Sequence, residues 1–324
     1  MSDASPKDPG RSQIRNRLFG RRPSRGADGL EDPFDEAFLQ QLELLEVVAR
    51  RIVSGRQRAE RRTQKVGSGL EFADYRPYSA GDDVRDVDWN VLVRLNEALV
   101  REYEEDEDLP VRVVVDASSS MMTRGGAKLR HAMRIGAALA YVALANLDRV
   151  GVEVTAADKL ETLPAVRGKG RIFRVFDFLR NAPRGGKTDI RASCNRVAAR
   201  ATQPGVTVVL SDFYDLEGAF EGLNLLRFRK HQPVAIQILD PVEADPRNSG
   251  LRGDVALLDT EGGPARDVTL TPAALGAYAE AHERFCQALE SNCRSRGIPY
   301  FRAPLDIPLD DLVLKIFRFG GVLR

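Results

Sequence analysis

The stretch Val111–Met121, VRVVVDASSSM, indicates both the fold of the chain and the position of its candidate site. The first half of this stretch is an apolar run rich in β-branched valine, which predicts a strand buried on both faces of a parallel sheet. At Asp116 the run changes to a carboxylate, followed by serines at 118, 119 and 120. In open α/β sheets, ligands bind just beyond the carboxyl ends of the strands. The stretch therefore predicts a central strand that carries a polar site at its end.

The side chains at this strand end offer one carboxylate and three hydroxyls within five residues. Such hard oxygen donors suit Mg²⁺ or Mn²⁺ rather than zinc. Serine and aspartate also cap helix N-termini, so the stretch by itself is equally typical of a helix cap. Two later strand-to-helix loops favour the metal site, because they add Thr188 in Gly-Lys-Thr-Asp and Asp212 directly after a second apolar strand.

Strand and helix patterns alternate from residue 111 to residue 240. Because crossovers between parallel strands are right-handed, this order predicts an α/β fold with one doubly wound, mostly parallel sheet and helices on both faces. Residues 34–62 carry apolar side chains at helical spacing and predict an N-terminal helix. From about residue 241, a Gly- and Pro-rich extension is expected to hold a small hairpin within residues 255–270 before the chain returns to helix and strand.

The composition is that of an ordinary globular protein without a strong electrostatic bias. Of 324 residues, 43% are hydrophobic and 29% are charged, and 48 basic residues stand against 47 acidic ones. This balance gives no overall attraction to nucleic acid or to a membrane surface. The three cysteines lack metal-ligand spacing, which favours a reducing compartment. With no signal peptide visible and no apolar stretch long enough to span a bilayer, a cytoplasmic location is expected.

Composition divides the chain into four parts. Residues 1–32 are rich in Pro, Gly, Ser and Arg and predict a disordered basic tail. The N-terminal helix is expected within 33–65, a small subdomain within 66–108, and the α/β domain with its extension within 109–324. In the small subdomain, arginines alternate with aspartates near Trp89, the only tryptophan. We interpret them as an ion-pair network around that ring, and a surface that contacts a partner is the alternative.

The polar residues at the three strand ends resemble a known metal site. In their order along the chain they resemble the metal-ion-dependent adhesion site of von Willebrand factor A-type domains, where Met121 directly after the third oxygen donor is also usual. The resemblance implies a von Willebrand A-like, Rossmann-like fold that binds Mg²⁺ or Mn²⁺. It assigns the metal to five residues: Asp116, Ser118, Ser120, Thr188 and Asp212. One coordination position stays open in such a site, and a carboxylate from the partner completes it.

The small subdomain carries a second resemblance. The pattern G-x-G-x-E-F…R-x-Y…G-D-D-x-R-x-x-D-W, followed by Asp-x-Ser-x-Ser-Met, is similar to the bacterial and archaeal family called domain of unknown function 58. The similarity covers roughly residues 60–240. Members of that family are commonly encoded beside MoxR-type AAA+ ATPases. The resemblance therefore implies that an ATPase of this type, or its client protein, is the partner.

Together these features predict a non-enzymatic, metal-dependent adaptor that works with a MoxR-type ATPase in the assembly, maturation or remodelling of client proteins. A Mg²⁺-dependent phosphohydrolase with Asp116 as nucleophile is one alternative. Haloacid-dehalogenase-like phosphatases place a second aspartate two residues later, where this chain has Ser118, and none of the three histidines is an obvious base. A nucleic-acid-binding protein that uses the N-terminal arginines is the other alternative, and the neutral overall charge argues against it.

Overall fold

A computed structural model describes residues 31–60, 66–67, 71–104, 110–157, 159–187, 189–201, 203–250, 252–260 and 265–319. Within these ranges the chain forms two compact units. The larger unit combines the residues up to 51 with those from 109 onward, and the smaller unit comprises residues 52–108. The predicted basic tail, residues 1–32, lies outside the described residues except for its last two.

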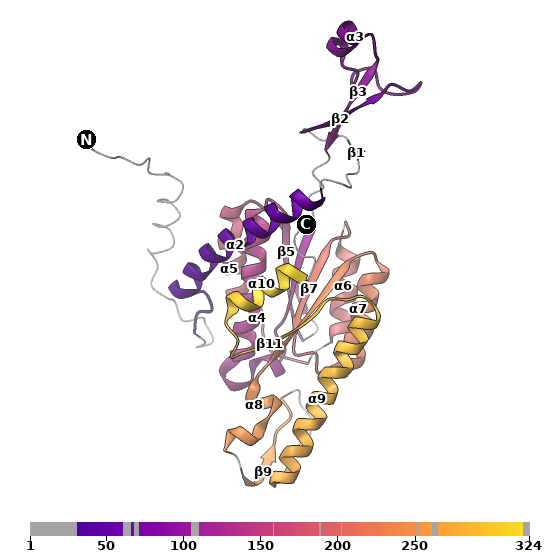
Figure 1. The fold of residues 1–324 in the computed structure, drawn as a ribbon. Coiled ribbons are helices and arrows are strands. Elements are labelled where there is room, and N and C mark those ends of the chain that lie inside the picture. The colour runs from indigo at the N-terminus through magenta and orange to yellow at the C-terminus, as the bar shows by residue number, and fades with distance from the viewer. Residues whose placement is uncertain are drawn as a thin grey trace, which may run out of the picture. The chain divides into compact units, whose positions relative to one another are not determined.

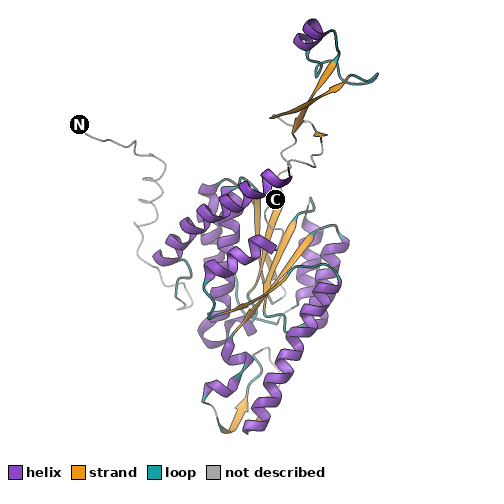
Figure 2. Ribbon diagram, viewed as in Figure 1, coloured by secondary structure: helices purple, strands orange, loops and turns teal. Residues whose placement is uncertain are grey.

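The larger unit is built on a six-stranded sheet (Figures 1 and 2). In spatial order its strands are β11 (Tyr300–Pro304), β8 (Gln232–Leu239), β7 (Val206–Ser211), β4 (Pro110–Asp116), β5 (Arg149–Ala156) and β6 (Lys159–Arg167). All neighbouring strands run parallel except β6, which pairs antiparallel with β5. The predicted α/β fold with a mostly parallel sheet is confirmed at this level.

Helices cover both faces of this sheet (Figure 1). One face carries α4 (Thr123–Ala145), α5 (Ile172–Asn181) and α10 (Leu309–Phe319), and the other carries α6 (Ile190–Arg200), α7 (Leu216–Phe228) and α9 (Pro272–Ser295). The N-terminal helix α2 (Glu36–Glu60) begins beside α5, where the Phe34 and Phe176 rings stack with centroids 4.5 Å apart. The prediction of an N-terminal helix is thus confirmed.

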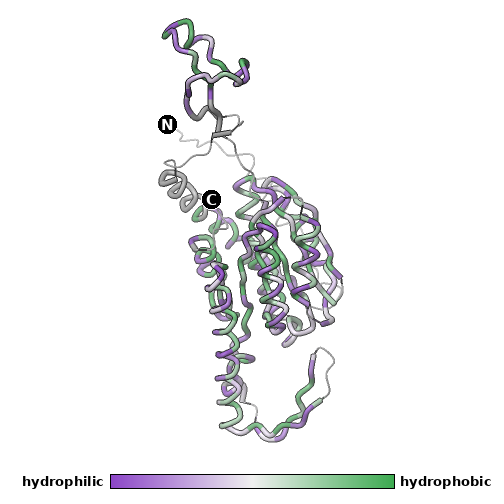
Figure 3. The backbone as a smooth tube through the Cα atoms, turned by 90° about the vertical axis from the view of Figure 1, so that its right-hand side faces the viewer, coloured by the Kyte–Doolittle hydropathy of each residue, from purple (hydrophilic) through white to green (hydrophobic). Residues whose placement is uncertain are grey.

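The core lies between the sheet and these helices because the central strands are apolar on both sides (Figure 3). Every residue of β7 is buried, as its continuous apolar run predicts. Helix α4 packs closely on β4, since a Cβ added at Gly136 would lie 2.9 Å from Val113 Cγ1. On the other face, Cys194 of α6 and Leu289 of α9 belong to one buried cluster with Val209 of β7. All three cysteines of the chain are buried and free.

The strand order places a topological switch point between β4 and β7. Strand β4 pairs with β5 on one side and with β7 on the other, and all three run in the same direction. After β4 the chain continues into α4 on one face of the sheet, and after β7 it continues into α7 on the opposite face. The loops that follow β4 and β7 therefore run to opposite faces of the sheet. Open α/β sheets bind ligands at such a point, beyond the carboxyl ends of the two strands.

The extension after β8 begins with the short helix α8 (Pro241–Ala244) and the 3₁₀ helix η3 (Pro246–Ser249). The expected hairpin follows as β9 (Gly253–Leu257) and β10 (Arg266–Leu270), which pair antiparallel. The extension ends in α9, so the chain rejoins the layer of helices that covers the sheet. Among the described helices, none is long and apolar enough to cross a membrane.

The smaller unit is an antiparallel sheet with a short helix. Its strands lie in the order β1 (Val66–Gly67), β3 (Leu99–Glu104) and β2 (Glu71–Pro77), and α3 (Trp89–Leu95) precedes β3. One ion pair of the expected kind forms between Arg76 and Asp82 at 2.6 Å, and a second joins Asp88 to Arg101, an arginine of β3 outside the predicted set, at 2.8 Å. They do not enclose the tryptophan, because the Trp89 side chain is 58% exposed. The interpretation of a network around that ring is therefore wrong, and the pairs instead brace the sheet and the N-terminus of α3.

Candidate functional site

Polar side chains meet at the switch point. Asp116 is the last residue of β4 and Asp212 directly follows β7, and both are almost fully buried. The two strand ends are tied together because Ser211 Oγ donates a hydrogen bond to Asp116 Oδ2 at 2.6 Å. The parallel register of β4 and β7 dictates this contact, since Val115 pairs with Leu210 one residue earlier. The structure thus brings Asp116 and Asp212 into one site.

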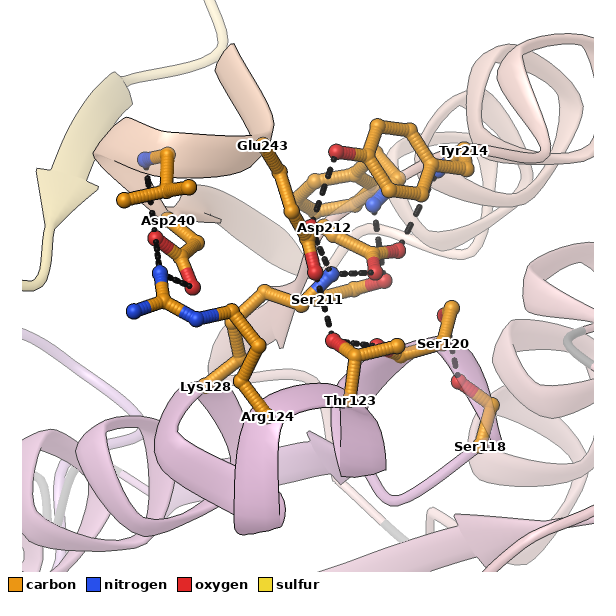
Figure 4. A network of polar contacts seen from close by, with 12 residues as sticks. Ser118, Ser120, Thr123, Arg124, Lys128, Ser211, Asp212, Tyr214, Asp240 and Glu243 are labelled. Atoms are coloured by element: carbon orange, nitrogen blue, oxygen red, sulfur yellow. Dashed lines mark hydrogen bonds and ion pairs between the residues drawn. The ribbon is translucent and has the colours of Figure 1, made fainter. Parts of the chain in front are cut away.

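Ser118 and Ser120 lie in the turn that follows β4. The Ser118 backbone N–H donates to Asp116 Oδ1 at 2.9 Å, and the hydroxyl oxygens of Ser118 and Ser120 are 3.1 Å apart (Figure 4). Both serines are buried. Neighbouring ligands of an octahedral Mg²⁺ ion with bonds of about 2.1 Å lie about 3 Å apart. The two hydroxyls therefore have the spacing of adjacent ligands on one small cation.

The third predicted loop also reaches the site. The Ser119 backbone N–H donates to Gly186 O at 2.9 Å, and Gly186 N–H donates back to Ser119 Oγ at 2.9 Å. A further bond joins Gly185 N–H to Ala117 O at 2.7 Å. Of the five predicted ligands, Asp116, Ser118, Ser120 and Asp212 converge here, and Thr188 lies outside the described residues.

Gly186 fits its place only without a side chain. Its φ is +84°, and an added Cβ would lie 2.3 Å from the Ala157 Cβ. We predict that Gly186→Ala lowers the free energy of unfolding by about 1–3 kcal/mol and loosens the loop from Ser119. Gly170→Ala is the matched control, because an added Cβ there meets nothing within 4 Å. Urea unfolding of both variants checks this, and equal stabilities would contradict the close contact.

A buried lysine was not foreseen in the site. Lys128 of α4 is 1% exposed, and its Nζ lies 3.0 Å from Asp212 Oδ2 and 2.6 Å from Glu243 Oε2. A sequence signal for it exists, because Lys128 shares one helical stripe with the buried residues Ala132 and Ile135. A lysine on the buried face of a helix needs an acidic partner inside the protein.

Glu243 comes from α8 and points into the site (Figure 4). Its Oε1 lies 2.5 Å from Thr123 Oγ1, which lies 2.9 Å from Ser120 O, so these two acceptors share the one hydroxyl proton of Thr123. Nearby, Arg124 Nη1 pairs with the buried Asp240 at 2.6 Å. These contacts hold the start of the extension against the loop that carries the serines.

The charges of the site are unevenly matched. The site brings together three carboxylates, those of Asp116, Asp212 and Glu243, against one ammonium, that of Lys128, so two negative charges remain if all four groups are ionised. Burial, followed by the negative charge of Asp212, raises the pKa of Asp116 to about 6. Burial works against the charged form of Lys128, but Asp212 and Glu243 outweigh it and raise that pKa. The site therefore favours an additional cation near Asp116.

The donor set decides which cation suits this position. Within the described ranges, no three His, Cys, Asp or Glu side chains gather as a metal-binding group. The oxygens near Asp116 are one carboxylate and two hydroxyls, which favours Mg²⁺ or Mn²⁺ with water in the remaining positions. The Asp116 carboxylate and the Ser118–Ser120 pair are thus chemically suited to such an ion.

Two solved structures resemble this chain at low sequence identity. An aerotolerance-related membrane protein from Bacteroides fragilis is 18% identical, with a TM-score of 0.41, and the match covers 65% of this chain and 98% of that one. The pilus adhesin SpaC of Lactobacillus rhamnosus GG is 12% identical, with a TM-score of 0.41, over 68% of this chain and 30% of the adhesin.

Relatives at the sequence level extend over nearly the whole chain. Uncharacterized proteins of Mycobacterium tuberculosis and Mycobacterium bovis are 27% identical over 307 residues, which is 93% of this chain and 94% of each relative. A family model with the description "Protein of unknown function DUF58" matches residues 74–285. This match takes in the ion-paired part of the smaller unit as well as Asp116, Lys128 and Asp212. The chain therefore belongs to the DUF58 family.

Proposed function

We propose that the larger unit is a von Willebrand A-like domain that binds Mg²⁺ or Mn²⁺ and uses the ion to hold a partner protein. The observation that carries the proposal is the pair of buried hydroxyls, Ser118 and Ser120, 3.1 Å apart beside a buried carboxylate at the switch point. Asp116, Ser118 and Ser120 would hold the ion directly. Asp212 is the fourth proposed ligand, and Thr188 remains a predicted fifth.

A bound Mg²⁺ or Mn²⁺ would supply an electrophilic centre with exchangeable water positions. The residues of the chain would then have two roles. The carboxylate of Asp116, fixed by Ser118 N–H and Ser211 Oγ, balances part of the charge of the ion. The two serine hydroxyls add neutral ligands, so the ion keeps its attraction for an acid. The open position would then take a carboxylate of the partner.

The partner and the biological setting come from the sequence. We propose that the chain is a non-enzymatic adaptor, and that it works with a MoxR-type AAA+ ATPase or a client of that ATPase in the cytoplasm. This proposal rests on the resemblance carried by the signature segment and by Asp-x-Ser-x-Ser-Met.

Affinity capture from the native lysate tests the proposal. The tagged wild type is compared in Mg²⁺ and in EDTA, and Asp116→Asn and Asp177→Asn are compared in Mg²⁺, with retained proteins identified by mass spectrometry. Asparagine removes the charge of Asp116 at constant size. Asp177→Asn is a matched control on α5, because the Asp177 side chain is 60% exposed.

The expected result is a protein, an ATPase or its client, that the wild type retains in Mg²⁺ but not in EDTA, and that Asp177→Asn also retains in Mg²⁺. Loss of that protein in EDTA and in Asp116→Asn would support a metal-bridged contact. The same set of proteins in all four captures would refute it.

A further inference from the structure

Asp212 is already engaged by the chain itself. Its Oδ2 lies 3.0 Å from Lys128 Nζ, and its Oδ1 accepts a hydrogen bond from Tyr214 N–H at 3.3 Å. The Asp212 side chain is fully buried, so water does not compete for these contacts. A metal ion that used Asp212 as a ligand would have to share this carboxylate with an ammonium.

Lys128 is held in place on several sides. Its Nζ contacts both Asp212 and Glu243, and it lies 4.9 Å from the centroid of the Tyr214 ring, a cation–π contact. A movement of the ammonium out of the site would leave Asp212 and Glu243 without a cation, and the Asp212 side chain is completely buried. We therefore regard the ammonium as a fixed positive charge next to the proposed metal site.

We propose that Lys128 is an internal cation that competes with the metal for Asp212 and so sets a low affinity for divalent ions. The proposal rests on the proposed function, because it concerns the same site. An ion would be held by Asp116, Ser118 and Ser120. Lys128 would weaken it in two ways, by like-charge repulsion and by occupying the carboxylate that would otherwise draw the ion in.

The arrangement gives the site a specific property. Asp116 ends β4 and the serines follow it, whereas Asp212 follows β7 on the other side of the switch point, where Lys128 of α4 pairs with it. A weakly held ion is easily lost unless a further ligand joins it. A partner carboxylate at the open position would supply that ligand, so metal and partner would bind cooperatively.

Direct titration with Mn²⁺, followed by electron paramagnetic resonance of the free ion, tests the inference. The purified full-length wild type is compared with Lys128→Met and with the double variant Lys128→Met/Asp212→Asn. Methionine is also unbranched, is one atom shorter than lysine and removes the charge. We expect Lys128→Met to bind Mn²⁺ at least about tenfold more tightly than the wild type. The double variant, which lacks the freed carboxylate, is expected to lose this gain.

The variant Asp116→Asn distinguishes failure of this inference from failure of the proposed function. In Asp116→Asn the proposed metal site itself loses its charged ligand. If that variant binds as poorly as expected but Lys128→Met binds like the wild type, the proposed function stands and the inference falls. If the wild type binds no Mn²⁺ and Lys128→Met does, the inference is supported and metal binding by the wild type is refuted. If neither binds, both proposals fail.

Glu243→Gln covers the case in which Lys128→Met does not fold, as judged by circular dichroism. The Glu243 side chain is 21% exposed, so the loss of its charge is tolerable. Without Glu243, the ammonium would pair with Asp212 alone and hold it more firmly. We expect Mn²⁺ binding about threefold weaker or more. Equal or tighter binding would show that the ammonium does not hold Asp212 against the ion, and would overturn the role of Lys128.

Discussion

In the metal-free protein at pH 8, the Asp116→Asn variant is expected to be more stable than the wild type by about 3 kcal/mol. The reason is that burial, with the charge of Asp212 as the second cause, raises the pKa of Asp116 to about 6 from an ordinary 3.8. Asparagine has no charge to bury. It can still accept from Ser118 N–H and donate to Ser211 Oγ, the two groups that contact Asp116.

The sign of the pH dependence follows from the raised pKa. Between pH 4 and pH 6 the folded protein holds a proton on Asp116 that the unfolded chain has already released. The wild type therefore loses stability as the pH rises through this window, and the difference from Asp116→Asn opens over the same window. Glu153, whose pKa burial raises to about 7, is present in both proteins, so its effect cancels in the difference.

Urea unfolding in EDTA at several pH values measures this difference. A gap that stays constant from pH 4.5 to pH 8 would show that Asp116 carries no burial penalty. Mg²⁺ should close most of this gap, because only the wild type keeps the charged ligand. An ion at about one hundred times its dissociation constant adds about 2.7 kcal/mol. Asp116 would then be a residue kept for binding at a cost in stability.

Much of the fold could be predicted because its strands are buried on both faces. Such strands appear as short runs rich in valine and leucine, as in Val206–Ser211, where Asp212 follows directly. Parallel pairing also made Asp212 predictable from Asp116, because both lie at carboxyl ends on one edge of the sheet. The helix Trp89–Leu95 gave no comparable signal. None of its residues is buried, so no apolar stripe marks it, and Asp88 supplies its cap.

The rest of the site depends on contacts between distant segments. Lys128 and Glu243 are 115 residues apart, and neither carries a motif. Glu243 lies on a four-residue helix in a Gly- and Pro-rich extension, where periodicity is too short to indicate a buried direction. The burial of Lys128 could be predicted from the sequence, because this residue falls on the buried stripe of a strongly apolar helix. Its partner could still not be named, since hydrophobic patterns say which face is buried and not what covers it.

Lys128→Met is expected to lower the free energy of unfolding by about 3–5 kcal/mol in metal-free buffer, because it leaves a fully buried Asp212 without its cation. The double variant Lys128→Met/Asp212→Asn should recover most of this loss, since no unpaired charge then remains. Urea unfolding of the four proteins of the cycle gives the coupling energy. A matched surface control is Arg191→Met, which removes an ion pair with Glu221 whose side chains are 68% and 56% exposed. That change should cost less than about 1 kcal/mol.

Adding Mn²⁺ to the same cycle separates the structural role of Lys128 from its proposed role as a competitor. In Lys128→Met the freed Asp212 lies beside Asp116, so a divalent ion can neutralise both carboxylates and restore part of the lost stability. The double variant keeps only Asp116 and should gain much less from the ion. If Mn²⁺ stabilised the wild type and Lys128→Met equally, Lys128 would be a structural cation only, and its charge would not lower the affinity of the site for the metal. If the gain in Lys128→Met were larger by at least about 1.4 kcal/mol, it would match the tenfold tighter binding expected from direct titration.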